Sequence, residues 1–190
     1  MSREKRAVAV FCGARKGNDP TFVELANQVG RAIAQRGWLL VYGGSSVGLM
    51  GEMADAALAA GGEVLGVIPQ QLVKQEVGHT GLQRLEIVAD MPVRKTRMID
   101  VADGFLVLPG GFGTLDELFE VVTLRQIGMH VKPIVLCDPA DYWGPLLVAC
   151  RALVAAGLAD VRDFDTIEQF GSVKEALDRL GQDGMLGRSN

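Results

Sequence analysis

The sequence predicts an α/β fold: a single Rossmann-like domain over residues 1–190, built on a doubly wound, mostly parallel sheet. Three observations lead to this prediction. Short apolar runs alternate along the chain with longer segments of helical periodicity, as expected when each strand is followed by a crossover helix. Two of the apolar runs pass directly into glycine-rich turns, which are typical of strand-to-helix junctions. The length of 190 residues suits one domain with a substantial core.

The apolar runs predict the strands, and segments with apolar residues at helical spacing predict the helices between them. The predicted strands are Ala7–Cys12, Trp38–Tyr42, Glu63–Ile68, Leu85–Val88, Phe105–Leu108 and Pro133–Cys137. The predicted helices are Pro20–Arg36, Leu49–Ala60, Met91–Val101, one from Leu115 onward, Trp143–Ala156 and Val173–Leu180. The irregular segment from Gln70 to Arg84 is expected to be a loop or a lid over a pocket, and the polar tail 181–190 is expected to fray.

Glycine and proline mark where these elements begin and end. Pro20 and Pro92 suit the first turn of a helix. Gly13 ends the first strand, Gly37 stops the first helix, and Pro69 closes the third strand.

Composition and charge exclude several classes of protein. The formal net charge is -4, so the chain has no overall basic field for nucleic acid. No apolar run approaches the length of a membrane span, and Ala7–Cys12 is too short for the core of a signal peptide. The widely separated Cys12, Cys137 and Cys150 fit buried free thiols better than a disulfide framework or a zinc cluster. We therefore expect a cytoplasmic protein with no metal and with neither nucleic acid nor membrane as a partner.

The stretch from Phe105 to Glu117 is the strongest functional signal. A buried strand is followed by a turn with glycines at 110, 111 and 113, and then by a helix. Backbone amides at such a helix start form an anion site that suits phosphate, to which Thr114 can add a hydroxyl and Glu117 a carboxylate. The alternative is a capping box, in which Thr114 and Glu117 only satisfy free backbone amides. The density of glycine favours phosphate, because a cap does not require it.

A second glycine-rich turn, Gly43–Gly48, follows the strand that ends at Tyr42. Taken alone, it is explained by a tight turn that lets the next helix pack on the sheet. Both turns come at the carboxyl ends of strands, which meet at one edge of a parallel sheet. We expect the functional site at that edge.

The glycine pattern matches neither common phosphate motif. Asp116 occupies the third glycine position of a dinucleotide-binding motif, and no glycine is followed by lysine and then serine or threonine. This points to a mononucleotide or a sugar phosphate. Arg94, Lys95 and Arg97 lie near the start of a predicted helix, where each opposes the helix dipole by roughly 0.3–1 kcal/mol. A solvated basic face is one explanation, and an anion bound between this helix and the glycine turn is the other.

These residues resemble a known family. The stretch Pro109-Gly110-Gly111-Phe112-Gly113-Thr114-Leu115-Asp116-Glu117 is similar to the PGGxGTxxE motif of the Lonely Guy family, the cytokinin-activating phosphoribohydrolases. The other matching stretches are Met91-Pro92-Val93-Arg94-Lys95-Thr96-Arg97-Met98, Phe11-Cys12-Gly13, Tyr42-Gly43-Gly44 and Gly48-Leu49-Met50-Gly51. The resemblance covers Val8 to about Asp160. It departs at Pro92-Val93 and at Ser45-Ser46, which affects substrate preference more than the reaction.

The resemblance implies hydrolysis of the N-glycosidic bond in adenosine 5′-monophosphates, with N6-substituted nucleotides preferred and no cofactor. In this scheme Glu117 stabilises the sugar cation or orients water, and Arg94 holds Glu117 and the ribose or base. The phosphate is assigned to the amides of Gly111 and Gly113, to the Thr114 hydroxyl and to Lys95. The remaining implied substrate contacts are Glu76, Phe112, Leu115, Asp116 and Thr123.

The resemblance also implies a homodimer, and it leaves two other functions open. One is a general purine-nucleotide nucleosidase without a hormone role. The other is a non-catalytic carrier of a phosphorylated cofactor, like the related molybdenum-cofactor carriers. The older label of the family, possible lysine decarboxylase, fits poorly because the pattern shows no obvious pyridoxal-binding lysine.

Overall fold

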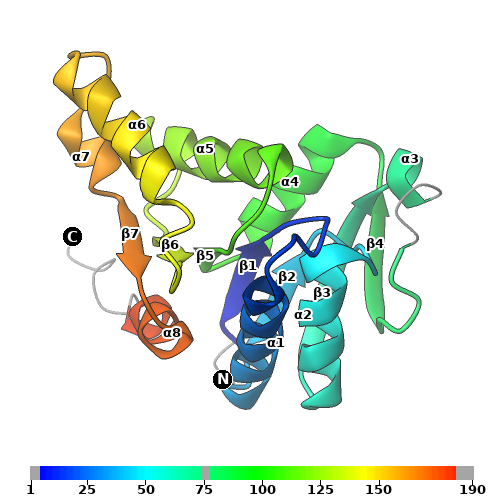
Figure 1. The fold of residues 1–190 in the computed structure, drawn as a ribbon. Coiled ribbons are helices and arrows are strands. Elements are labelled where there is room, and N and C mark those ends of the chain that lie inside the picture. Colours follow the sequence, from blue (N-terminus) through cyan, green and yellow to red (C-terminus); the bar gives the residue numbers. More distant parts are fainter. Residues whose placement is uncertain (1–4, 74–77, 183–190) are drawn as a thin grey trace.

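The computed structural model describes residues 5–73 and 78–182, which form a parallel sheet covered by helices on both faces (Figure 1). The strands are β1 (Ala7–Phe11), β2 (Leu39–Tyr42), β3 (Glu63–Pro69), β4 (Arg84–Val88), β5 (Gly104–Val107), β6 (Ile134–Cys137) and β7 (Ile167–Phe170). Their order is β4-β3-β2-β1-β5-β6-β7, and every neighbouring pair is parallel. The predicted doubly wound α/β fold is confirmed, and the winding reverses between β1 and β5.

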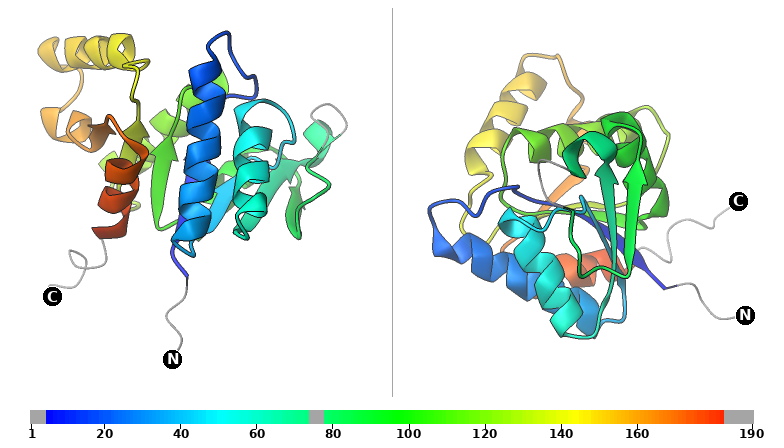
Figure 2. Two further views of the ribbon diagram at one scale, coloured as in Figure 1. Left: turned by 60° about the horizontal axis from the view of Figure 1, so that its bottom comes forward. Right: turned by 90° about the vertical axis from the view of Figure 1, so that its right-hand side faces the viewer.

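The helices lie in two layers, one on each face of the sheet (Figures 1 and 2). They are α1 (Pro20–Gln35), α2 (Gly48–Ala59), α3 (Gln70–Val73), α4 (Met91–Val101), α5 (Phe112–Gln126), α6 (Gly144–Ala155), α7 (Val161–Phe164) and α8 (Val173–Gln182). Successive residues of a strand point to opposite faces. Leu106 of β5 therefore packs in the core under α1, α2 and α8, whereas Phe105 packs in the core under α4, α5 and α6.

Every strand predicted from the sequence is present, and the structure adds β7 and the short helices α3 and α7. β7 was missed because its sequence, Ile-Glu-Gln-Phe, is half polar and only partly buried, as suits an edge strand. The segment from Gln70 to Arg84, expected to be irregular, begins with the four residues of α3. Of the tail expected to fray, Gly181 and Gln182 belong to α8, and 183–190 lie outside the described residues.

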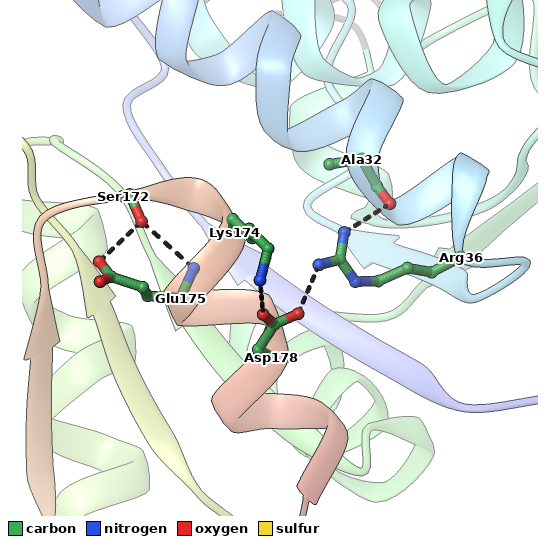
Figure 3. A network of polar contacts seen from close by, with 6 residues as sticks. All are labelled: Ala32, Arg36, Ser172, Lys174, Glu175 and Asp178. Atoms are coloured by element: carbon green, nitrogen blue, oxygen red, sulfur yellow. Dashed lines mark hydrogen bonds and ion pairs between the residues drawn. The ribbon is translucent and has the colours of Figure 1, made fainter.

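Helix α8 is held against α1 by polar contacts away from the carboxyl ends of the strands (Figure 3). Arg36 Nη2 pairs with Asp178 Oδ1 at 2.8 Å, and Lys174 also pairs with Asp178. At the start of α8, Ser172 Oγ accepts the Glu175 backbone N–H (3.2 Å) and donates to Glu175 Oε2 (2.7 Å). Exposed ion pairs of this kind contribute little to stability, because water and salt screen them.

The carboxyl ends of β1 and β5 lie side by side, at the point where the winding reverses. Gly13, just after β1, donates its N–H to the carbonyl of Pro109 (3.1 Å), and its own carbonyl accepts the N–H of Leu49 (3.0 Å). The loops that follow β1 and β5 are thereby joined to each other and to the start of α2. Doubly wound sheets bind ligands at this position.

Candidate active site

A cavity of about 710 Å³ opens at the carboxyl ends of β1 and β5, within the size range typical of ligand sites. Its walls come from the loop after β1, the glycine turn after β5, and the starts of α2, α4 and α5. The lining residues are 12–17 and 109–114, together with Phe22, Leu49, Met50, Leu72, Met91, Arg94, Glu117 and Tyr142.

The glycine turn leaves the start of α5 open. Gly111 is the N-cap, and no side chain caps the helix. A Cβ atom at Gly111 or Gly113 would meet no atom within 4 Å, so a ligand can approach this backbone closely. Gly110 has a different role, because a Cβ there would lie 2.1 Å from Thr114 Oγ1. Amides at an open helix start attract anions, so phosphate binding at this turn stays a prediction that the open backbone permits.

The capping-box interpretation of Thr114 and Glu117 is wrong. Helix α5 begins at Phe112, before the predicted start at Leu115, so Thr114 is the third residue of the helix and not its N-cap. Glu117 consequently lies a full turn deeper than a capping carboxylate. It is 8% exposed and lines the cavity.

Glu117 forms a buried ion pair with Arg94 of α4. Arg94 Nη1 lies 3.3 Å from Glu117 Oε1, and Arg94 Nε donates to the carbonyl of Val67 in β3 (3.1 Å). Arg94 is 6% exposed, so a solvated basic face does not explain it. A Cβ at Gly43 would lie 1.8 Å from Arg94 Nη2. The glycine after β2 is thus needed to make room for the guanidinium.

Burial raises the pKa of Glu117 to about 7, because a carboxylate removed from water is disfavoured in its charged form. The positive charge of Arg94 opposes this rise in pKa, and the nearby Asp116 adds to it. A carboxyl group with a strongly shifted pKa in a cavity is typical of catalytic sites. Burial and the charge of Glu117 also raise the pKa of the Cys12 thiol, which therefore stays protonated and unreactive.

Lys95 points to a different environment from Arg94. Its Nζ pairs with Asp116 Oδ2 at 3.0 Å and with Glu120 Oε2 at 2.7 Å, and the residue does not line the cavity. Arg97 pairs with Glu86 of β4 at 2.7 Å. Of the three clustered cations, Arg94 is the one that lines the cavity.

The structure brings most of the predicted site residues together and separates a few from them. Those that line the cavity are Arg94, Gly111, Phe112, Gly113, Thr114 and Glu117. Those of the described residues that do not line it are Lys95, Leu115, Asp116 and Thr123. Thr123 is exposed on a later turn of α5. Glu76 lies outside the described residues.

Two parts of the cavity wall were not predicted. Arg15 and Lys16, in the loop after β1, line the cavity, and the central position of β1 in a doubly wound sheet could have indicated this. Tyr142, for which the sequence carries no local signal, donates its hydroxyl to the carbonyl of Gly110 (2.8 Å). Asp138 fixes the Tyr142 loop by accepting the N–H groups of Tyr142 and Trp143, both at 2.7 Å.

Other features bear on the classes considered from composition. All three cysteines are free and buried, as predicted. Within the described ranges, no group of three or more His, Cys, Asp or Glu side chains is arranged to hold a metal ion. No helix in this part of the chain is long and apolar enough to cross a membrane.

The sequence matches one protein family and several of its members. Residues 50–180 match the family model described as "Possible lysine decarboxylase". The chain is 48% identical over 143 residues to the cytokinin riboside 5′-monophosphate phosphoribohydrolase of Rhodococcoides fascians, covering 75% of this chain and 72% of that protein. The chain belongs to this phosphoribohydrolase family. The resemblance seen in its motifs is thereby confirmed.

Two further family members match over more of their length. Phosphoribohydrolase LOG7 of Arabidopsis thaliana is 46% identical over 179 residues, 94% of this chain and 82% of its own. The Mycobacterium tuberculosis phosphoribohydrolase is 43% identical over 173 residues, 90% of each chain.

Solved structures with the same fold include proteins that handle the molybdenum cofactor. The molybdenum cofactor binding protein of Rippkaea orientalis aligns with a TM-score of 0.68 at 22% identity, over 95% of this chain and 98% of its own. The Moco carrier protein of Chlamydomonas reinhardtii aligns with a TM-score of 0.67 at 21% identity, over 94% and 97%. At these identities the similarity shows the fold alone.

Proposed function

We propose that this family member hydrolyses the N-glycosidic bond of adenosine 5′-monophosphates, preferring N6-substituted (cytokinin) nucleotides, and releases the base and ribose 5-phosphate. The observation that carries this proposal is the buried ion pair of Glu117 and Arg94, set in a cavity beside an open helix start. The names of relatives that are 48% and 46% identical support the same reaction.

The phosphate is assigned to the start of α5. The backbone there is open at Gly111 and Gly113, and the Thr114 hydroxyl lies one residue further along the helix. Lys95 is already paired with two carboxylates outside the cavity, so it is a poor candidate for the phosphate cation. Arg15, which lines the cavity, takes that role in this proposal.

Glu117 acts on the sugar. Cleavage of the glycosidic bond leaves positive charge on the ribose, which a nearby carboxylate stabilises while water attacks. Burial strengthens that electrostatic effect and, at the same time, favours the protonated carboxyl, with a pKa of about 7. Arg94 opposes the protonation and holds the carboxylate in place.

A decarboxylase of the pyridoxal type fits these residues poorly. Such an enzyme needs a lysine whose amine is desolvated and activated to form a Schiff base. Lys16 is the lysine among the described lining residues, and its side chain is 60% exposed and paired with Glu52.

The test is the release of free base from three compounds, followed by chromatography. We expect turnover of AMP and of its N6-isopentenyl derivative. Adenosine should be at least about 100-fold poorer in kcat/KM, because hydrogen bonds to a charged phosphate contribute about 1.5–3 kcal/mol each. Equal rates for AMP and adenosine would contradict the phosphate assignment.

The same assay separates the alternative functions. Equal kcat/KM for AMP and the N6-isopentenyl nucleotide would indicate a general purine-nucleotide nucleosidase. Binding of nucleotides with no release of base from any of them would indicate a carrier, and the proposed reaction would be wrong.

The proposal includes a cytoplasmic homodimer. Exposed apolar side chains on α6 and the turn after it, Val148, Leu153 and Leu158, support an assembly of copies. Light scattering of the protein at micromolar concentration should give twice the chain mass. A measured mass of 20.3 kDa would exclude the dimer.

A further inference from the structure

Tyr142, in the loop between β6 and α6, contacts the glycine turn at the start of α5. Its hydroxyl donates to the carbonyl of Gly110 at 2.8 Å, and the residue lines the cavity. Because β6 pairs with β5 in the sheet, the loops at their carboxyl ends are neighbours. A side chain from the loop after β6 thus reaches the turn that follows β5.

The loop that carries Tyr142 is held by the buried carboxylate of Asp138. Asp138 is 4% exposed and accepts the backbone N–H groups of Tyr142 and Trp143, both at 2.7 Å. Gln169 of β7 donates a third hydrogen bond to this carboxylate at 3.2 Å. Asp141, just before Tyr142, has a φ of 54°, in the left-handed region that residues other than glycine seldom adopt. The backbone of this loop is therefore held from the side of the sheet.

The ring of Tyr142 is held in place as well. It packs edge to face against Phe22 of α1, with 5.4 Å between the ring centroids, and against Trp143, with 4.7 Å. The position of the hydroxyl consequently does not depend on the glycine turn. The turn, in contrast, can be positioned by the hydroxyl.

The hydroxyl contacts the peptide unit between Gly110 and Gly111. A peptide unit between two glycines rotates with little steric resistance, because neither residue has a Cβ atom. The carbonyl of the preceding residue, Pro109, is fixed separately by the N–H of Gly13 at 3.1 Å. In a trans peptide the C=O and N–H groups point in opposite directions. Holding the Gly110 carbonyl therefore also sets the direction of the Gly111 N–H.

The orientation of this peptide unit decides which of its two polar groups faces a ligand at the start of α5. An N–H attracts an anion, whereas a rotated unit would present a carbonyl oxygen, which repels one. Tyr142 is 41% exposed, so water can replace its hydroxyl as the partner of the carbonyl. Water donates equally well in either orientation, however, and so does not fix one of them.

We propose that Tyr142 is a positioning residue for the phosphate, an inference that rests on the function proposed above. Its hydroxyl holds the peptide unit with the Gly111 N–H directed toward the phosphate and the Gly110 carbonyl directed away from it. Tyr142 acts on the ligand through the turn. Its effect is therefore confined to ligands that carry the phosphate.

The experiment compares the wild type with Tyr142→Phe, which keeps the ring and removes the hydroxyl. Thr166→Val is the matched control, because Thr166 Oγ1 also donates to a backbone carbonyl, that of Asp163 (2.7 Å), and does not line the cavity. Calorimetry measures the affinity for the two halves of AMP, ribose 5-phosphate and adenosine. In Tyr142→Phe the affinity for ribose 5-phosphate should fall about tenfold, as when a hydrogen bond to a charged group is lost, and that for adenosine should not change. Thr166→Val should leave both affinities unchanged.

Turnover gives a second readout of the same contact. In Tyr142→Phe the KM for AMP should rise about tenfold with little change in kcat, because the phosphate is bound alike in the ground state and the transition state. A lower thermal midpoint with both affinities intact would show a merely structural role and overturn the proposal. Equal losses for ribose 5-phosphate and adenosine would also overturn it. If the wild type binds AMP and releases no base, the proposed reaction is wrong, and the two affinities still decide the role of Tyr142.

Discussion

Two helix starts in this chain share a sequence pattern, a hydroxyl residue followed three positions later by glutamate, but they differ in structure. At α8, Ser172 directly precedes the helix, and its Oγ accepts the N–H of Glu175 (3.2 Å), as in a capping box (Figure 3). At α5, the helix has already begun at Phe112, so Thr114 lies inside it and no side chain caps the end. The pattern marks a cap only where the preceding residues are not helical.

The two glutamates also differ in their surroundings. Glu175 is exposed and bonds to the adjacent Ser172. Glu117 is buried, and its partner Arg94 comes from α4, at a distant point of the sequence. The contact of Glu175 with Ser172 caps the start of α8. The pair of Glu117 and Arg94 lies in the cavity, where both side chains can contact a ligand.

The largest expected effect is that of Glu117→Gln. Glutamine retains the shape of the side chain but removes the charge that we propose stabilises the sugar cation, so kcat should fall by about 100-fold or more. The variant should still fold and bind AMP. Glu175→Gln is the matched control and should keep the wild-type kcat, because glutamine also serves in a capping box. A Glu117→Gln enzyme within a few-fold of wild type would show that the charge is not catalytic.

The partner of Glu117 can also be displaced by a substitution at Gly43, a residue that does not itself line the cavity. In Gly43→Ala the new methyl group would overlap Arg94 Nη2, which lies 1.8 Å from the Cβ position. A shift of the guanidinium should lower kcat about 10- to 100-fold, as small misplacements in active sites do.

Gly113→Ala is the matched control for Gly43→Ala. A Cβ at Gly113 has no atom within 4 Å, and alanine is favoured over glycine in a helix. The variant should be at least as stable as wild type in thermal unfolding, with any loss confined to the KM for AMP. If kcat fell equally in both variants, the lack of a side chain at Gly43 would not be what positions the Arg94 guanidinium.

The effect of pH on turnover should be smaller: below the pKa of Glu117, kcat should change about tenfold for each pH unit. The pKa of Glu117 is raised to about 7, so its ionised form is lost as the pH falls below that value. If the carboxylate is the active form, kcat should rise with pH up to about 7 and level off above it. A rate that rises as the pH falls through 7 would show that the protonated form acts, as an acid toward the leaving base.

Turnover should rise with pH, whereas the stability of the protein should fall as the pH rises because of the same raised pKa of Glu117. The folded state keeps the Glu117 proton up to a pH of about 7, whereas the unfolded chain releases it near the ordinary value of 4.5. The contribution of this group to stability is therefore present at low pH and declines as the pH rises from about 4.5 to 7. The thermal midpoint of the wild type should therefore fall relative to that of Glu117→Gln as the pH rises over this range.

The smallest effect should come from Ser172→Ala. Removing the hydroxyl cap of α8 should lower the free energy of unfolding by about 1 kcal/mol and leave kcat unchanged. Denaturant titration and the base-release assay measure the two quantities. Because the contacts of α8 lie away from the carboxyl ends of the strands, we expect no effect on the site. A change in kcat would show that α8 is coupled to it.

Most of the fold was predictable because its signals are local. Buried parallel strands such as β1 and β5 consist of continuous apolar residues, and glycine or proline marks their ends. β7 escaped prediction since an edge strand is covered less and tolerates Glu168 and Gln169. Neighbouring residues of a helix point about 100° apart, so the pattern of α4 could not tell which of Arg94 and Lys95 faces the cavity.

By itself, the sequence determined the doubly wound sheet, the glycine turn after β5 and the motif that names the family. Only the tertiary structure decided where Glu117 and Arg94 lie and that they form a buried pair. Their burial depends on α4 and α5 both reaching the carboxyl ends of the strands, where the two side chains pair, and Arg94 fits there because Gly43, just after β2, has no side chain. The raised pKa of Glu117 follows from the same packing, since the cost of removing a charge from water is set by everything around it rather than by its neighbours in the chain.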